Sequence, residues 1–245
     1  MSSRTAAQRA IAEGRVLLGG LPAQRPATLI DEQAPLSLRG AERQWASRGG
    51  IKLAGALEAF GIDSAGRRCL DVGASTGGFT DVLLAGRAAA VVAVDVGYGQ
   101  LDWRLRSDPR VTVFDRTNFR TVEPAALGGP FDLVVVDVSF ISVRLLAPNL
   151  AACGRPGTDY VVLVKPQFEV GREQVGRGGL VTDPGRQGSA VGSVAEALRA
   201  AGIGIAGVCP SPITGATGNR EFFLHGRSGT DQPLEAGALE KAVSS

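Results

Sequence analysis

Short apolar runs separated by helical stretches fill the chain from residue 51 onward, and they constrain its fold more than any other feature. The runs Val91–Val94 and Leu133–Val136 are apolar without alternation, which is typical of parallel strands covered on both faces. We therefore expect a doubly wound, Rossmann-like α/β sheet, with ligands bound outside the carboxyl ends of its strands. The pattern predicts seven strands, at Arg68–Val72, Val91–Val96, Val111–Phe114, Leu133–Val138, Tyr160–Val164, Ile203–Cys209 and Glu221–Leu224.

The first 44 residues have a different pattern and are too few to bury a large core alone. They predict a helix and then extended segments, at Thr5–Glu13, Arg15–Leu18 and Ala27–Leu38, with a turn at Gly19–Pro22. We expect a small unit at residues 1–44 and a main domain at 45–245. Residues 1–52 carry eight basic and four acidic side chains, against eighteen and twenty in the remainder, which is a mild indication of a nucleic-acid partner.

Composition and the lengths of the apolar runs argue against a disordered, a membrane-spanning or a secreted protein. With 44% hydrophobic and 20% charged residues the chain is globular, its longest apolar runs are too short to span a membrane, and its first residues contain no signal-peptide core. These features predict a soluble, cytoplasmic protein. Three cysteines, an odd number without metal-ligand spacing, favour buried free thiols over a metal or catalytic role; they are Cys69, Cys153 and Cys209.

Lysine is rare in this chain, with three residues against twenty-three arginines. Codon bias is one explanation, but Lys52 and Lys165 lie where chemistry is expected, and only Lys241 lies in the C-terminal tail. An arginine cannot lose its proton in a protein, whereas a desolvated lysine, or one close to another cation, can act as a base. Lysine at these two positions therefore suggests proton transfer.

A glycine turn follows the first predicted strand of the sheet. Residues 71–80, DVGASTGGFT, lead from that strand into a helix, and Asp95 at the end of the second strand is placed to accept hydrogen bonds from ribose hydroxyls. A dinucleotide is the alternative ligand, but the Gly-x-x-x-Gly-Gly spacing and the position of Asp71 inside the strand favour S-adenosylmethionine. The predicted cofactor-binding residues are Gly73, Ala74, Ser75, Thr76, Gly77 and Asp95.

Four further residues are expected at the same edge of the sheet. Asp137 and Lys165 end the fourth and fifth predicted strands, Lys52 lies on the helix before the first strand, and Glu221 begins the last strand. Solvated ion pairs would explain each of them separately. Their convergence beside a cofactor turn favours a catalytic site.

Six segments together resemble the TlyA family of ribosomal RNA cytidine-2'-O-methyltransferases, often labelled haemolysin A, whose catalytic fold is that of the FtsJ/RrmJ RNA methyltransferases. They are SRGGIKL at 47–53, DVGASTGGFT at 71–80, DVGYGQL at 95–101, DVSFIS at 137–142, LVKPQFE at 163–169 and GNREFFL at 218–224. The resemblance covers nearly the whole chain. It implies a class I methyltransferase sheet, S-adenosylmethionine as cofactor, and ribosomal RNA or ribosomal subunits as partners.

The resemblance also assigns roles to residues. The Lys-Asp-Lys-Glu tetrad of the family falls on Lys52, Asp137, Lys165 and Glu221, and Asn118 lies where the family approaches the adenine of the cofactor. It implies that Lys165, its pKa lowered by burial and by Lys52, takes the proton of a ribose 2'-hydroxyl or stabilises the alkoxide, without a metal. The chain lacks the cysteine of carbon-5 cytosine methyltransferases and the Asn-Pro-Pro-Tyr-like motif of amine methylation, so methylation of oxygen fits best.

Three segments stand outside this pattern or leave alternatives open. Residues 3–20 resemble the second half of an S4-like (alpha-L) RNA-binding domain, which predicts either that this domain is truncated or that the start codon was placed too far downstream. The glycine-rich stretch Gly171–Gly179, with Arg172 and Arg177, is either a lid over RNA or an ordinary surface loop, and His225 is expected in the core or at the rim.

Two rival functions remain, a membrane-active haemolysin and a ribosome-binding factor without catalysis, although no amphipathic cationic helix supports the former.

Overall fold

We describe residues 4–31, 34–38, 45–230 and 237–244 of a computed structural model of the chain. The chain divides into two compact units, residues 1–44 and residues 45–245. Within the described residues, no helix is long and apolar enough to cross a membrane.

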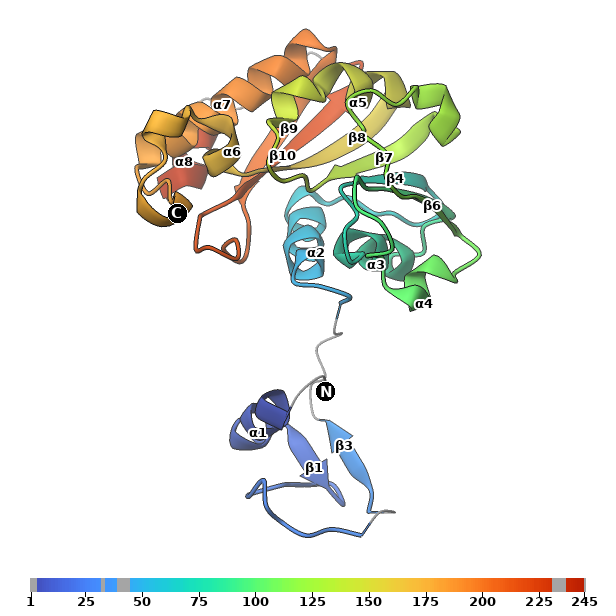
Figure 1. The fold of residues 1–245 in the computed structure, drawn as a ribbon, viewed down its shortest axis with the longest axis vertical. Helices are drawn as coiled ribbons and strands as arrows, with labels where there is room; N and C mark the ends of the chain where they lie inside the picture. The colour runs from blue at the N-terminus through green and yellow to red at the C-terminus, as the bar shows by residue number, and fades with distance from the viewer. Residues whose placement is uncertain (1–3, 32–33, 39–44, 231–236, 245) are drawn as a thin grey trace. The chain divides into compact units, whose positions relative to one another are not determined.

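The first unit contains one helix and a small antiparallel sheet (Figure 1). Helix α1 (Arg4–Ala12) is followed by β1 (Val16–Leu18), β2 (Leu21–Pro22) and β3 (Leu36–Leu38), and β1 lies in the middle of the sheet. Gly19 and Gly20, with φ of 58° and 87°, form the tight turn between β1 and β2. The extended segment expected at Ala27–Leu38 is too long, since of its described residues (27–31 and 34–38) only the last three pair as a strand.

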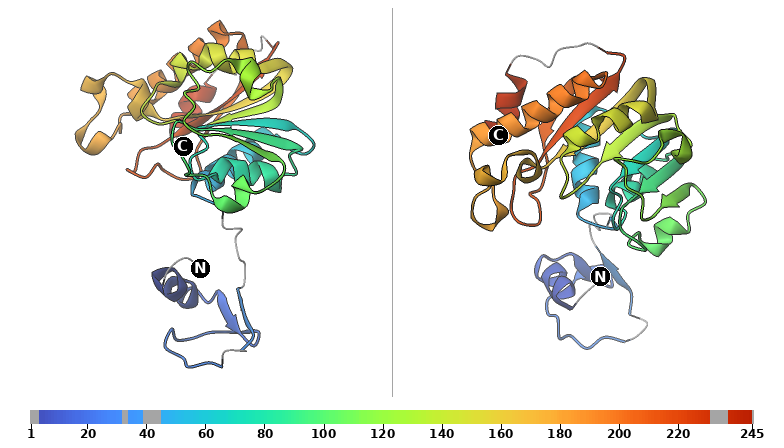
Figure 2. Two further views of the ribbon diagram at one scale, coloured as in Figure 1. Left: turned by 45° about the vertical axis from the view of Figure 1, so that its right-hand side comes forward. Right: turned by 45° about the horizontal axis from the view of Figure 1, so that its top comes forward.

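The second unit is a seven-stranded sheet in the order β6-β5-β4-β7-β8-β10-β9, with helices on both faces (Figures 1 and 2). Strands β4 to β8 are parallel to one another, and β10 runs antiparallel between β8 and β9. The strands are β4 (Arg68–Val72), β5 (Ala90–Val94), β6 (Val111–Phe114), β7 (Phe131–Val136), β8 (Gly154–Val164), β9 (Ile203–Pro210) and β10 (Phe222–Ser228). The predicted doubly wound sheet is confirmed.

Helices lie between most successive strands of this unit, one more helix precedes the first strand, and another follows the last strand. The α-helices are α2 (Gly49–Phe60), α3 (Gly78–Ala85), α4 (Trp103–Arg106), α5 (Ala147–Cys153), α6 (Pro166–Glu169), α7 (Pro184–Ala200) and α8 (Ala238–Ser244). Four short 3-10 helices add η1 (Pro124–Leu127), η2 (Val143–Leu145), η3 (Arg172–Gln174) and η4 (Arg177–Gly179).

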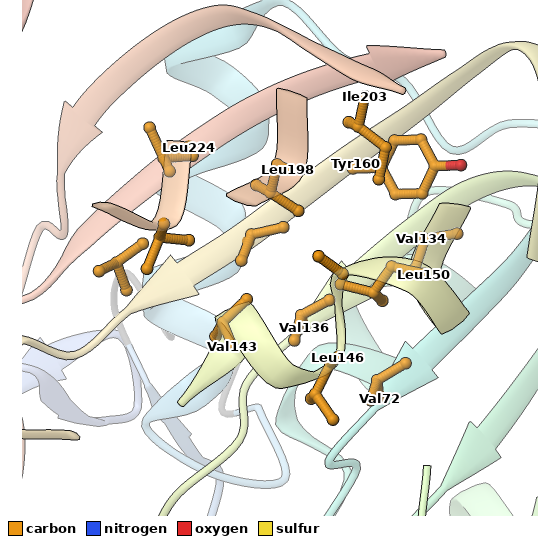
Figure 3. Packing of buried hydrophobic residues seen from close by; sticks show 14 of the residues in the cluster. Val72, Val134, Val136, Val143, Leu146, Leu150, Tyr160, Leu198, Ile203 and Leu224 are labelled. Atoms are coloured by element: carbon orange, nitrogen blue, oxygen red, sulfur yellow. The ribbon is translucent and has the colours of Figure 1, made fainter. Parts of the chain in front are cut away.

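Alternate residues of the strands build two separate cores. On one face, residues such as Val72, Val134 and Val136 pack against Leu150 of α5 and Leu198 of α7 (Figure 3). On the other face, the intervening residues of the same strands pack against α2 and α3; they include Cys69, Val91, Leu133, Val135 and Leu163. Because both faces are covered, runs such as Val91–Val94 and Leu133–Val136 are apolar instead of alternating.

The boundaries of two strands shift in a way that matters for the site. β5 ends at Val94 and β7 ends at Val136, each two residues earlier than predicted, so Asp95 and Asp137 come directly after their strands. Glu221 directly precedes β10 instead of opening it. All three side chains consequently belong to the loops at the edge of the sheet, where the backbone is free to approach a ligand.

Candidate active site

The glycine turn between β4 and α3 lies against the end of β7. Gly73 has a φ of +86°, and a Cβ atom there would lie 2.4 Å from the carbonyl oxygen of Asp137. Gly77 has a φ of +96°, and a Cβ atom there would lie 2.3 Å from the side chain of Leu105. The turn therefore requires glycine at both positions, for conformation and for space.

Asp95 fastens this turn to the end of β5. Its Oδ2 accepts a hydrogen bond of 2.8 Å from the backbone N–H of Ser75, and its Oδ1 accepts one of 2.7 Å from Gly97. Each carboxylate oxygen has a second lone pair, so Asp95 can still accept bonds from ligand hydroxyls. Its position at the strand end is the one that the sequence predicts.

A cavity of about 470 Å³ opens beside the turn at the carboxyl ends of β4, β5 and β7. Gly73, Ser75, Asp95 and Asn118 line it, together with apolar side chains such as Leu146. The Oδ1 of Asn118 accepts a hydrogen bond of 3.0 Å from the backbone N–H of Arg120. An apolar slot with a few polar groups, of this size, fits a nucleoside-like ligand such as S-adenosylmethionine.

Other predicted cofactor residues lie around the turn rather than in this cavity. Ala74 and Thr76 line a neighbouring cavity, and the lining of neither cavity includes Gly77. Sequence reasoning missed several lining residues, among them Gln100, Thr117, Phe119 and Ile141. Gln100 belongs to the segment DVGYGQL, which the family resemblance includes, but the sequence does not indicate that this side chain lines the cavity.

The neighbouring cavity, of about 370 Å³, contains both candidate lysines. Lys52, Lys165 and Asp137 line it. Four residues line both cavities and form the wall between them, namely Gly73, Ser75, Asp137 and Ser139. A group bound in one cavity is thus next to a group bound in the other.

Each lysine forms an ion pair with one carboxylate. The Nζ of Lys52 lies 2.5 Å from Oε2 of Glu221, and the Nζ of Lys165 lies 2.6 Å from Oδ1 of Asp137. Lys165 also donates a hydrogen bond of 2.8 Å to the Oγ of Ser139. Both lysines and Glu221 are at most 9% exposed, so these charges are held largely out of water. The second cation that we expected beside Lys165 is itself balanced by Glu221.

Four separate elements deliver these side chains to one edge of the sheet. Lys52 lies on α2, whose neighbouring Leu53 is buried in the core. Asp137 and Lys165 follow the adjacent parallel strands β7 and β8. Glu221 reaches the same edge because β10 is antiparallel to β8, with Phe222 opposite Val164.

Asp71 is buried in β4 beneath the glycine turn. Its Oδ2 accepts a hydrogen bond of 2.6 Å from the Oγ1 of Thr80, and its Oδ1 has no hydrogen-bond partner among the described residues. Burial raises the pKa of Asp71 to about 7, against the smaller lowering effect of the Thr80 hydrogen bond. This carboxyl lines neither cavity but lies beneath the turn that forms part of both, and the sequence by itself indicated no separate role for it.

Glu169 joins the loop after β7 to the segment after β8. It accepts hydrogen bonds from the Oγ of Ser142, at 2.5 Å, and from the backbone N–H of Val143, at 2.8 Å. Burial raises the pKa of Glu169, and these hydrogen bonds oppose the rise. In the same loop Phe140 has a φ of +65°, is exposed, and lies against the ring of Phe168. Both segments were recognised as motifs, but their contact depends on the fold.

The histidine and the three cysteines singled out in the sequence line neither of the two cavities. The Nε2 of His225 lies 2.9 Å from Oδ1 of Asp159, and its ring packs beside Phe60. The residue is half-buried within β10, and core or rim was the expectation. All three cysteines are free, and Cys209 is only partly buried. Burial raises the pKa of Cys69 to about 12 and that of Cys153 to about 11. The described residues contain no group of three His, Cys, Asp or Glu side chains that could hold a metal ion.

The strand order, the glycine turn and the acidic residue after β5 define a class I, S-adenosylmethionine-dependent methyltransferase. The family model of the FtsJ-like methyltransferases matches residues 45–228. Together with the relatives described next, this match shows that the chain belongs to the TlyA family of FtsJ-like methyltransferases.

The relatives match over most of their length. The chain is 53% identical to the 16S/23S rRNA (cytidine-2'-O)-methyltransferase TlyA of Mycobacterium tuberculosis, over 98% of this chain and 90% of the relative. It is 35% identical to hemolysin A of Brachyspira hyodysenteriae, over 91% of this chain and 93% of that protein. Among solved structures, a candidate hemolysin from Streptococcus thermophilus is 38% identical with a TM-score of 0.79, covering 100% of this chain and 90% of the other.

Proposed function

We propose that this enzyme methylates a ribose 2'-hydroxyl of ribosomal RNA, at cytidine, with Lys165 as the group that handles the hydroxyl proton or the alkoxide. The observation that carries the proposal is the pair of lysine–carboxylate ion pairs, whose two buried lysines line a cavity that shares a wall with the cofactor cavity. The cytidine and the ribosomal RNA come from the name of the Mycobacterium tuberculosis relative.

The cofactor cavity fits S-adenosylmethionine in size and in its polar groups. Asp95 would accept hydrogen bonds from the ribose hydroxyls, Asn118 would lie at the adenine, and Gly73 would let the backbone approach the ligand closely. When bound, S-adenosylmethionine supplies an electrophilic methyl group on a positively charged sulfur.

The chemistry left to the protein is to prepare a poor nucleophile. A ribose hydroxyl becomes reactive as its proton leaves. Lys165, at the cavity wall, would take that proton at Nζ when it is a neutral amine, or would stabilise the negative oxygen when it is an ammonium. Asp137 and Ser139 fix the position of this Nζ. Lys52 with Glu221 would add a second buried pair that orients the sugar and balances charge.

The RNA partner is supported by features outside the cavity. The first unit resembles part of an S4-like RNA-binding domain in sequence, and phosphate contacts of such a unit would position the substrate without taking part in catalysis. Ribosomal RNA as substrate implies action in the cytoplasm.

Methyl transfer from tritiated S-adenosylmethionine tests the proposal. The substrates are ribosomal subunits and naked ribosomal RNA from a strain that lacks the enzyme, followed by mapping of 2'-O-methyl groups. We expect incorporation at cytidine, and its abolition by Lys165→Ala and Lys165→Arg with cofactor affinity retained. A fully active Lys165→Arg variant would exclude the role of Lys165 as a base, because arginine keeps its proton.

The name hemolysin A of the Brachyspira hyodysenteriae relative supports a second candidate, a membrane-active protein. Release of haemoglobin from red cells by the purified protein tests it. Lysis that persists when the cofactor turn is disrupted by Gly73→Ala would favour this candidate. Lysis by neither protein would exclude it.

A further inference from the structure

Two buried side-chain amides hold the end of the glycine-rich segment, which we define as residues 171–181. The Oδ1 of Asn219 accepts a hydrogen bond of 2.9 Å from the backbone N–H of Val181, and its Nδ2 donates one of 2.8 Å to the carbonyl of Gly179. Gln187 of α7 donates from Nε2 to the carbonyl of Val181 at 2.8 Å. Asn219 and Gln187 are each 2% exposed. Buried amides therefore bind both backbone groups of Val181, its N–H and its carbonyl.

Asn219 also belongs to the connection between β9 and β10, which forms part of the catalytic cavity. Thr214 and Ala216 of this connection line the cavity that contains Lys52. The carbonyl of Asn219 accepts a hydrogen bond of 2.8 Å from Gly215, and a Cβ atom at Gly215 would lie 2.4 Å from Oε1 of Glu221. Asn219 thus stands at the base of the loop that packs against Glu221, two residues before it in the chain.

The contacts of Asn219 indicate positioning rather than direct chemistry. The lining of neither cavity includes Asn219, but its amide joins two segments 40 residues apart. Both segments are rich in glycine and are costly to order without such a partner. A buried amide that loses its partners also costs more than an exposed one.

We propose that Asn219 is a positioning residue, which couples the glycine-rich segment to the β9–β10 connection and thereby holds Glu221 against Lys52. The inference rests on the proposed function of the Lys52–Glu221 pair. It makes the glycine-rich segment a support of the catalytic wall, rather than a separate surface loop.

Kinetics of Asn219→Ala test the proposal, with Tyr160→Phe as a matched control. Tyr160, which is buried, also joins β8 to β10, with its hydroxyl 3.0 Å from the Oγ of Ser228, but toward the other end of the paired region. For Asn219→Ala we expect kcat on ribosomal RNA to fall about tenfold per folded molecule, which corresponds to about 1.4 kcal/mol. The Kd of S-adenosylmethionine should stay within twofold. Tyr160→Phe should keep kcat within twofold at a similar loss in Tm.

Gln187→Leu provides a second variant if Asn219→Ala does not fold. It removes the donor to Val181 but leaves Asn219 in place, so we expect a smaller loss of kcat, about threefold. A kcat within twofold of wild type for Gln187→Leu, and for Asn219→Ala where it folds, would overturn the proposal and leave these amides a purely structural role.

Hydrogen exchange separates failure of this inference from failure of the proposed function. In the absence of RNA, Asn219→Ala should accelerate exchange in residues 176–181 and also in 211–222, whereas Tyr160→Phe should accelerate neither. Faster exchange confined to 176–181 would refute the coupling even if the enzyme is active. A wild-type protein that transfers no methyl group to RNA would refute the proposed function, while the exchange comparison still decides the coupling.

Discussion

The buried carboxyl of Asp71 makes the stability of this enzyme depend on pH in a way that Asp71→Asn should remove. The unfolded chain exposes this carboxyl to water, where its pKa is 3.8, whereas burial in β4 raises the pKa to about 7. The folded state thus binds this proton more tightly than the unfolded state does. The contribution to stability is complete below pH 3.8 and is lost as the pH rises through 7.

The size of the effect follows from the two pKa values. A difference of about 3 units corresponds to about 4 kcal/mol over the whole titration, of which about 3 kcal/mol falls between pH 5 and pH 8. Asparagine has nearly the same shape as the protonated acid and can still accept the hydrogen bond from Thr80. We therefore expect the unfolding free energy of Asp71→Asn to gain about 3 kcal/mol relative to wild type between these pH values.

Urea unfolding of the cofactor-free protein at half-unit steps from pH 5 to pH 8 measures this difference. The control is Asp63→Asn, which removes an exposed carboxylate that accepts a hydrogen bond from Ala65. Its unfolding free energy should run parallel to that of wild type. The contrary result is a difference in unfolding free energy between Asp71→Asn and wild type that changes by less than about 1 kcal/mol from pH 5 to pH 8. In that case burial does not raise the pKa of Asp71 as inferred.

Three further predictions concern the site. Gly73→Ala places a Cβ atom 2.4 Å from the Asp137 carbonyl, so calorimetry should show at least a hundredfold weaker binding of S-adenosylmethionine; affinity within threefold would contradict the tight packing of the turn. Glu221→Gln leaves Lys52 buried without its counter-charge, and we expect the unfolding free energy to fall by about 3 kcal/mol with a loss of methyl transfer; an unchanged denaturation midpoint would argue against the ion pair. Glu169→Ala removes the link between the loops after β7 and β8, and limited proteolysis should then cut near Ser142 faster than in wild type, with equal rates as the contrary outcome.

Much of the fold was predictable because its signals are local. All seven predicted strands are present, with β4 and β6 at the predicted bounds, since runs such as Val91–Val94 carry no polar residue for a solvent-exposed face. The glycine turn was predictable for the same reason, because a backbone position with a positive φ favours glycine. The errors fell at strand ends, where Val96 and Val138 are apolar but lie beyond the last ladder pair.

The site was predictable only as a set of residues. Because parallel strands end at a common edge, the sequence places Asp137 and Lys165 near one another. It does not state that Lys52 pairs with Glu221, 169 residues away. That pairing depends on β10 running antiparallel beside β8, and no local pattern specifies the partner or direction of a strand. The roles of Glu169 and Asn219 were not visible for the same reason.

The local sequence was sufficient to predict the elements, the cofactor turn and the family, because backbone conformation and two-sided burial restrict which residues can stand at a position. It did not predict which acid balances which lysine, or which buried side chains hold the loops around them. These are contacts between segments far apart in the chain, and their energies depend on distance and burial. Both quantities exist only once the strands have assembled into one sheet.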